Sequence, residues 1–252
     1  MAVEGSTVTG VGSHGTRLTP DLVCRQAAAA GCAAVIAGTL VGGVLGRLAM
    51  SLLASRNPED AGVLTDDGFI IGEVTVRGTV QLFGASTSMA MVGAAAYMMV
   101  RPLLFGTRAE RVLVASYGFG VTAAALLIHP GGPDFSLLEP LWLSVVLFVA
   151  LPVALVAVFA TLVEHWLERD SWFLTAPRRR VLPLLAIGLA GGVALVIVVP
   201  VFLAALVWAA VQVSEDDAPR SAATRRVGQV LLAAIAGAGT LGLISDVTAI
   251  FA

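Results

Sequence analysis

Long apolar runs constrain this chain more than any other feature of its sequence. Six stretches of mostly apolar residues follow one another, separated by short polar segments. A helix of about 20 residues crosses the hydrocarbon core of a bilayer, so each run is a candidate transmembrane helix. The predicted spans cover residues 27–50, 79–100, 112–129, 141–163, 181–211 and 228–250.

The composition agrees with a membrane protein. Of the 252 residues, 58% are hydrophobic and 13% are charged, and the mean hydropathy is +0.91. Soluble domains are about 45–50% apolar and about 25% charged. We therefore expect an all-α membrane protein, a bundle of about six transmembrane helices in the cell (plasma) membrane, with the lipid bilayer as its main partner. The net charge of −2 gives no reason to expect a nucleic-acid partner.

The chain ends and the arginines predict an orientation. Residues 1–24 lack the apolar core of a signal peptide and are expected to form a flexible cytoplasmic tail, and residues 25–252 a single transmembrane domain. Cytoplasmic loops carry an excess of arginine. If the tail is cytoplasmic, the inner segments hold nine arginines: Arg17, Arg25, Arg101, Arg108, Arg111, Arg169, Arg178, Arg179 and Arg180. The outer segments then hold six: Arg47, Arg56, Arg77, Arg220, Arg225 and Arg226. We therefore predict that both termini are cytoplasmic.

The outer loop, residues 56–78, differs from the apolar runs on either side. It contains "AGVLT" and "FIIGEVTV", which are rich in β-branched and aromatic residues, and "DDG" stands between them. Such segments flanking a turn predict a small β-hairpin. Its position predicts a cap over the outer mouth of the helix bundle.

Three roles remain open for the charges of this loop. Asp66 or Asp67 can pair with Arg47 or Arg56 and fix the loop to the bundle. The acids can instead bind a divalent cation, although their spacing does not follow a calcium-loop pattern. The third interpretation is a plain solvated hairpin. The acids concerned are Glu59, Asp60, Asp66, Asp67 and Glu73.

Small residues recur every four positions in the first span. Ala34, Gly38, Gly42 and Gly46 are predicted to lie on one helix face. A stripe of small residues allows a second helix to approach closely. The stripe can serve packing within the monomer, a homo-oligomer, or the docking of a membrane partner subunit.

Residues that carry chemistry are scarce. All 15 basic residues are arginines, which excludes a Schiff-base lysine and a P-loop lysine. "EHWLERD" groups Glu164, His165 and Glu168 near a span end, but no second cluster completes a metal site, so we expect a solvated helix end. The sequence therefore predicts no catalytic residue, no metal site and no cofactor.

One segment resembles a known group of proteins. "GRLAM" after the glycine-rich first span, "TDDGFIIGEVT" in the loop, and "GT" opening the second span are similar to a group of uncharacterised actinobacterial multi-pass membrane proteins. The similarity covers mainly residues 42–80. It implies a multi-pass membrane protein and no particular activity.

The leading interpretation is a non-enzymatic scaffold or accessory subunit that packs through small-residue helix faces. The alternative is a transporter or channel for a small, weakly polar solute, with Ser86 and Ser88 lining its path. A membrane enzyme acting on lipid is a third interpretation, and it would use Glu164, His165 and Glu168.

Overall fold

The structure is a computed structural model that describes residues 20–65, 68–190 and 220–252. In this part of the chain, five helices are long and apolar enough to cross a membrane. They are Pro20–Arg56, Val76–Leu103, Arg108–Leu127, Leu141–Trp166 and Arg225–Ile250. The all-α fold and the multi-pass membrane class are confirmed. The predicted flexible tail up to residue 19 and most of the predicted span 181–211 lie outside the described residues.

The first rod of the bundle is one continuous helix of 37 residues. It consists of α1 (Pro20–Ala37), the π-helical segment η1 (Gly38–Leu45) and α2 (Gly46–Arg56). At about 1.5 Å per residue the rod is roughly 55 Å long, so it protrudes from a hydrocarbon core of about 30 Å.

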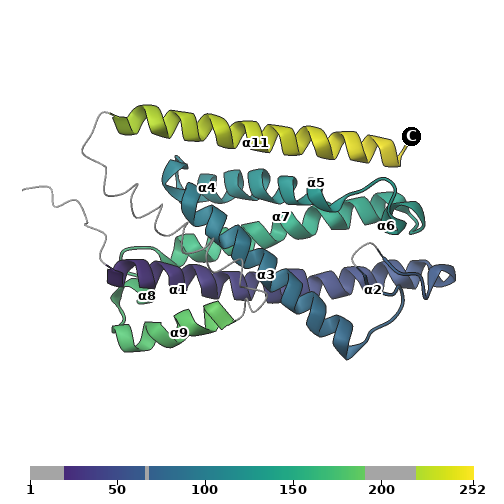
Figure 1. Cartoon of the computed structure of the whole chain (residues 1–252), viewed down its shortest axis with the longest axis horizontal. Helices are drawn as coiled ribbons and strands as arrows, with labels where there is room; N and C mark the ends of the chain where they lie inside the picture. The colour runs from purple at the N-terminus through teal and green to yellow at the C-terminus, as the bar shows by residue number, and fades with distance from the viewer. Residues whose placement is uncertain (1–19, 66–67, 191–219) are drawn as a thin grey trace, which may run out of the picture.

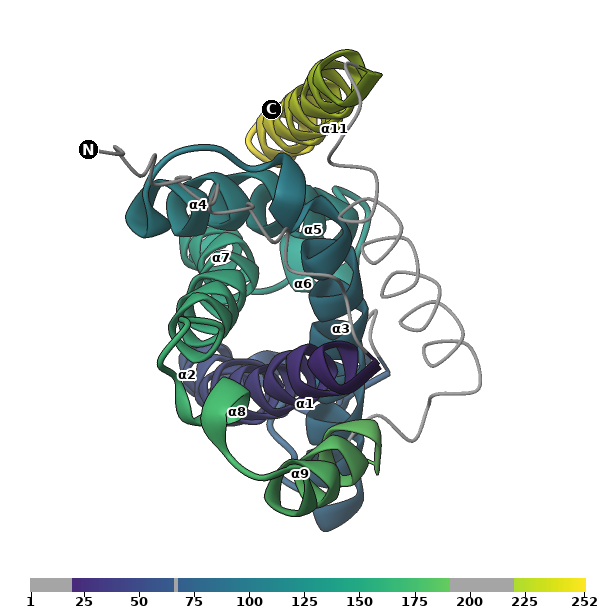
Figure 2. The ribbon, with the colours of Figure 1, turned by 90° about the vertical axis from the view of Figure 1, so that its left-hand side faces the viewer.

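The other long helices complete the bundle around this rod (Figure 1). They are α3 (Val76–Val100) with the 3₁₀ turn η3 (Arg101–Leu103); α4 (Arg108–Ala115), the π-helical η4 (Ser116–Gly120) and α5 (Val121–Leu127) in sequence; α7 (Leu141–Trp166); and α11 (Arg220–Ile250). Four shorter elements lie between them: η2 (Pro58–Asp60), α6 (Pro133–Ser136), α8 (Trp172–Thr175) and α9 (Arg178–Ala190). Seen along the bundle, α11 lies outside α5 and α9 lies against α1 (Figure 2).

Glycines let the π-helical segments contact neighbouring helices at close range. A Cβ on Gly38 would lie 2.6 Å from the Cα of Thr87 on α3, and one on Gly120 would lie 2.6 Å from the Cα of Val153 on α7. No side chain fits at such distances. The helix pairs η1–α3 and η4–α7 are therefore held together by backbone proximity that only glycine permits.

The two ends of the bundle differ in charge. The arginine-rich end comprises the start of α1, the η3–α4 turn, the residues around α8 and the start of α9. The loop end comprises residues 57–75 and 128–140. Among the described arginines, only three belong to the loop half: Arg47, Arg56 and Arg77.

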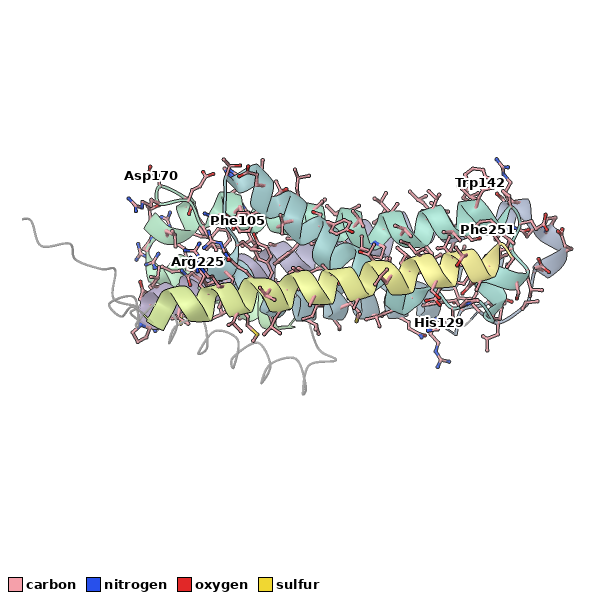
Figure 3. All side chains as sticks on the ribbon, turned by 90° about the horizontal axis from the view of Figure 1, so that it is seen from above. Phe105, His129, Trp142, Asp170, Arg225 and Phe251 are labelled. Atoms are coloured by element: carbon pink, nitrogen blue, oxygen red, sulfur yellow. The ribbon has the colours of Figure 1, made fainter. Side chains whose placement is uncertain are left out.

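Helix α11 runs from the arginine-rich end to the loop end (Figure 3). Near its start, the Gln229 Nε2 donates to the Leu103 carbonyl at 2.9 Å. Near its end, Val247 packs with Ile128 and Phe135. The start of α1 and the end of α11 thus lie at opposite ends of the bundle.

Three arginines stand at the start of α11: Arg220, Arg225 and Arg226. They lie at the arginine-rich end of the bundle, whereas the sequence grouped them with Arg47, Arg56 and Arg77.

The predicted β-hairpin is wrong for the residues that the structure describes. The loop contains no strand there, only an isolated antiparallel bridge between Leu64 and Ile70. Gly62 and Gly72 have positive φ angles of 94° and 80°, which interrupt an extended chain on both sides of the bridge. Further on, the side chain of Thr75 accepts from the Gly78 amide at 3.0 Å and caps α3, so the predicted second strand ends in a helix start.

Candidate functional site

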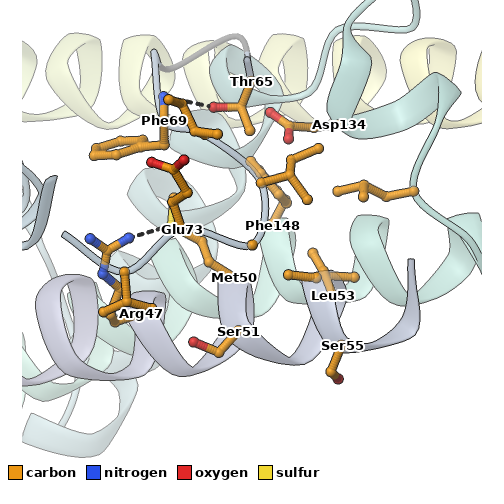
Figure 4. Close-up of a pocket in the computed structure, with 16 residues that line it drawn as sticks. Arg47, Met50, Ser51, Leu53, Ser55, Thr65, Phe69, Glu73, Asp134 and Phe148 are labelled. Atoms are coloured by element: carbon orange, nitrogen blue, oxygen red, sulfur yellow. Dashed lines mark hydrogen bonds between the residues drawn. The ribbon is translucent and has the colours of Figure 1, made fainter. Parts of the chain in front are cut away.

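A cavity of about 330 Å³ lies at the loop end, between α2, the loop and the start of α7 (Figure 4). Ligand pockets begin at about 300 Å³, so it has room for a small molecule. Its wall is mostly apolar: Met50, Leu53, Ile70, Ile71, Leu138 and Phe148. A few polar side chains join this wall: Arg47, Ser51, Ser55, Thr65, Glu73 and Asp134.

Arg47 supplies the positive charge of the cavity. Its Nε and Nη2 donate to the Thr79 Oγ1 at 3.3 and 3.0 Å. Its guanidinium carbon lies 5.9 Å from the centroid of the Phe69 ring, in a cation–π contact. These contacts join α2, the loop and the start of α3, so the guanidinium is held in one place. No carboxylate of the described residues forms an ion pair with it.

The predicted pairing of Arg47 or Arg56 with Asp66 or Asp67 cannot be followed, because both aspartates lie outside the described residues. Arg56 is exposed at the end of α2 and has no ion pair in the described part of the chain. The nearest acidic group to Arg47 in the cavity wall is the exposed Glu73 (Figure 4). Asp134, on α6, is 5% exposed and lies across the apolar wall from it.

Asn57 fixes the wall of the cavity. Its side chain is buried, and Nδ2 donates to the carbonyls of Leu53 and Glu139 at 2.8 and 3.0 Å. Its Oδ1 accepts from the Glu139 amide at 2.8 Å. Two of these hydrogen bonds tie the end of α2 to the segment that precedes α7, and the third returns to α2 itself. Sequence reasoning missed Asn57, although an asparagine before a proline at a helix end, as in "RNPED", is a local signal for such a contact.

A second polar site lies at the arginine-rich end and centres on Glu164. Its Oε1 accepts from the Tyr97 hydroxyl at 2.8 Å and from the Arg101 Nε at 2.6 Å. Its Oε2 accepts from the Arg101 Nη2 at 3.3 Å and from the Arg111 Nη1 at 3.4 Å. The carboxylate therefore bridges α3, η3, α4 and α7. Glu164 is 5% exposed, so the predicted solvated helix end is wrong for this residue.

The other two members of the predicted cluster, His165 and Glu168, are exposed. Glu168 pairs with Arg108, and its Oε2 lies 3.5 Å from the His165 Nδ1. Arg108 also donates to the Thr161 carbonyl at 3.2 Å. Within the described ranges, no group of three or more His, Cys, Asp or Glu side chains could hold a metal ion. Glu164 is therefore buried among partners from other helices, whereas its sequence neighbours His165 and Glu168 are exposed.

The predicted glycine stripe faces the chain's own helices. Ala34 is fully buried, and Gly38 lies against Thr87 as described above. A Cβ on Gly42 would lie 2.4 Å from the Cβ of Ser86. Gly46 is buried, with Leu82 the nearest side chain to a Cβ placed on it, at 3.9 Å. The stripe is therefore covered by α3.

The predicted polar path of the second span is also occupied. Ser86 packs against the glycine stripe, and the Ser88 Oγ donates to the Gly84 carbonyl of its own helix at 2.8 Å. Tyr117 and Thr240 share a hydrogen bond of 2.8 Å between η4 and α11. These groups satisfy one another or their own helix, as polar groups in a bilayer must.

Comparisons with protein families, curated proteins and solved structures found no match to this chain. Of the two sites, the cavity has room for a ligand, whereas the carboxylate of Glu164 is enclosed by its own partners.

Proposed function

We propose that this chain is a non-enzymatic, accessory membrane protein that binds a small amphipathic anion in the cavity at its loop end. The observation that carries the proposal is Arg47. Its guanidinium is held by Thr79 and Phe69 in the wall of a mostly apolar cavity, without a carboxylate partner among the described residues. An apolar pocket with a few fixed polar groups is the usual form of a small-molecule site.

The chemistry of the wall defines the ligand. Guanidinium groups bind carboxylates and phosphates through two parallel hydrogen bonds. The neighbouring wall of Met50, Leu53 and Phe148 favours an apolar body. A ligand with an anionic end at Arg47 and an apolar remainder satisfies both parts. The cavity volume of about 330 Å³ limits it to a small molecule.

The distribution of arginines supports an outward-facing cavity. Arginine is enriched on the cytoplasmic side of membrane proteins. The described arginines gather at the end opposite the cavity, apart from Arg47, Arg56 and Arg77. We therefore propose that the arginine-rich end is cytoplasmic, that the start of α1 is cytoplasmic, and that the end of α11 faces outward.

The other interpretations have less support. A scaffold that docks through the glycine stripe would need Gly38 and Gly42, which α3 already covers. A transport path along α3 would need Ser86 and Ser88, whose side chains are engaged within the bundle. We therefore place the accessory role in ligand binding at the loop end.

Native mass spectrometry of the intact chain, gently extracted from its host membrane, tests the proposal. We expect the wild-type protein to carry a bound molecule of defined mass. Arg47→Gln should lose this molecule, because the anionic end has no partner. Met50→Trp should lose it too, because the Met50 side chain lies in the cavity wall and the larger indole takes up part of the cavity.

Arg56→Gln is the matched control, since Arg56 lies on the same helix, is exposed and does not line the cavity. It removes the same charge and should keep the molecule. A wild-type protein with no bound molecule, or one retained by both cavity variants, would overturn the proposal.

A further inference from the structure

The arginine-rich end carries a cluster of arginines that is separate from the cavity. Five arginines surround the η3–α4 turn, and we call them the basic rim: Arg101, Arg108, Arg111, Arg225 and Arg226. The last two come from α11, whose Gln229 donates to the Leu103 carbonyl of η3. Arg225 lies one turn before Gln229, and Figure 3 shows it at the same end as Phe105 of the turn.

Among the described residues, the basic rim has more arginines than carboxylates that pair with them. Glu164 is shared by Arg101 and Arg111, and Glu168 pairs with Arg108. The Glu110 side chain accepts from the Thr107 amide and caps its own helix. Within the described residues, Arg225 and Arg226 form no ion pair, and both are exposed.

A donor inside the rim also lacks a partner. The Nε of Arg111 is buried and forms no hydrogen bond in the described part of the chain. Its Nη1 reaches Glu164 only at 3.4 Å. The Arg111 side chain is 32% exposed, so the outer part of its guanidinium can reach an acceptor that is not part of the protein.

The position of the rim fits a membrane–water interface. Helix α3 ends and α4 begins beside it, and Trp166 and Trp172 lie at the same end of the bundle. Tryptophan prefers the headgroup zone. Apolar side chains stand exposed on the same helices as the arginines, Leu113 on α4 and Val230 on α11. The surface therefore offers cations at headgroup level and apolar contacts one to two turns deeper.

We propose that the basic rim binds the headgroup phosphate of an anionic phospholipid in the leaflet at the arginine-rich end. Guanidinium groups bind phosphate oxygens in pairs, and basic pockets between transmembrane helices hold anionic headgroups. A zwitterionic lipid offers the same phosphate, but its attached ammonium is repelled by Arg225 and Arg226, which form no ion pair among the described residues. The acyl chains of the lipid lie along Leu113 and Val230. This site is independent of the cavity at the loop end.

The test uses the full-length protein in bicelles that contain phosphatidylcholine with a minority of phosphatidylglycerol. Native mass spectrometry counts the molecules of each lipid that remain bound. We expect the wild-type protein to retain phosphatidylglycerol preferentially. The double variant Arg225→Gln/Arg226→Gln should lose about five-fold in this preference for each arginine removed. Both residues are exposed, so folding is preserved, which an unchanged unfolding midpoint in phosphatidylcholine alone verifies.

The matched control is Arg56→Gln/Arg77→Gln, two exposed arginines of the loop half. It changes the net charge equally and should leave the preference intact. An unchanged preference in the Arg225/Arg226 variant, or an equal loss in the control, would overturn the proposal. Displacement of the lipid by inorganic phosphate, at a concentration where sodium chloride has no effect, would point to a free-anion site and would also overturn it.

Discussion

Replacing Glu164 with glutamine removes the only described carboxylate that joins α3, η3, α4 and α7. The glutamine side chain would keep the volume and one acceptor for the Tyr97 hydroxyl, but it would leave Arg101 and Arg111 without their counter-charge. Removing one partner of a buried ion pair costs about 3–5 kcal/mol. The Arg101 and Arg111 side chains are 25% and 32% exposed, so water recovers part of that loss. We expect Glu164→Gln to lower the free energy of unfolding by roughly 2–3 kcal/mol.

Equilibrium unfolding in mixed micelles, with increasing sodium dodecyl sulfate, measures this difference. Glu168→Gln is the matched control, because it makes the same chemical change one turn further along. The side chains of Glu168 and its partner Arg108 are 50% and 41% exposed, so the control should lose less than about 1 kcal/mol. Equal losses in the two variants would show that burial of Glu164 does not matter and would refute the reasoning.

Three further predictions concern the bundle. Gly38→Ala should lower the free energy of unfolding by about 1–3 kcal/mol through overpacking, whereas Gly84→Ala, with nothing within 4 Å of its Cβ position, should have no such effect in the same micelle assay. Asn57→Ala should cost about 1–3 kcal/mol, because it leaves buried backbone groups of the loop end without partners, and hydrogen exchange there should accelerate. Alkaline phosphatase fused after Phe251 should be active and green fluorescent protein fused there should be dark; the reverse result would contradict the outward-facing end of α11.

The sequence predicted the long helices well because each needs only a continuous apolar run. The runs 79–100 and 141–163 correspond to Val76–Leu103 and Leu141–Trp166. A run of this kind says nothing about the direction in which a later helix crosses. The sequence therefore grouped the arginines at the start of α11 with those of the loop half, and the structure places them at the other end of the bundle.

The polar contacts were predicted poorly because their partners are far apart in sequence. Glu164 forms hydrogen bonds with Tyr97, Arg101 and Arg111, which are 53 to 67 positions away in the sequence. No local pattern around "EHWLERD" predicts these contacts. The predicted hairpin of the loop is absent from the described residues for a different reason. Its β-branched residues favour strands, but Gly72 and the cap at Thr75 outweigh that preference.

The π-helical segment η1 also sets the rotation of everything beyond it. Each residue of an α-helix turns the chain by about 100°, so a residue inserted into or deleted from the rod turns its far part by the same angle. A π-helical segment accommodates extra residues of this kind without ending the helix. If Gly38–Leu45 kept its π-helical winding, shortening it by one residue would turn α2 about its axis and carry Arg47 out of the cavity wall, while Ala34 on the near side kept its place. The winding of one short segment of the rod thus determines which side chain of α2 faces the cavity.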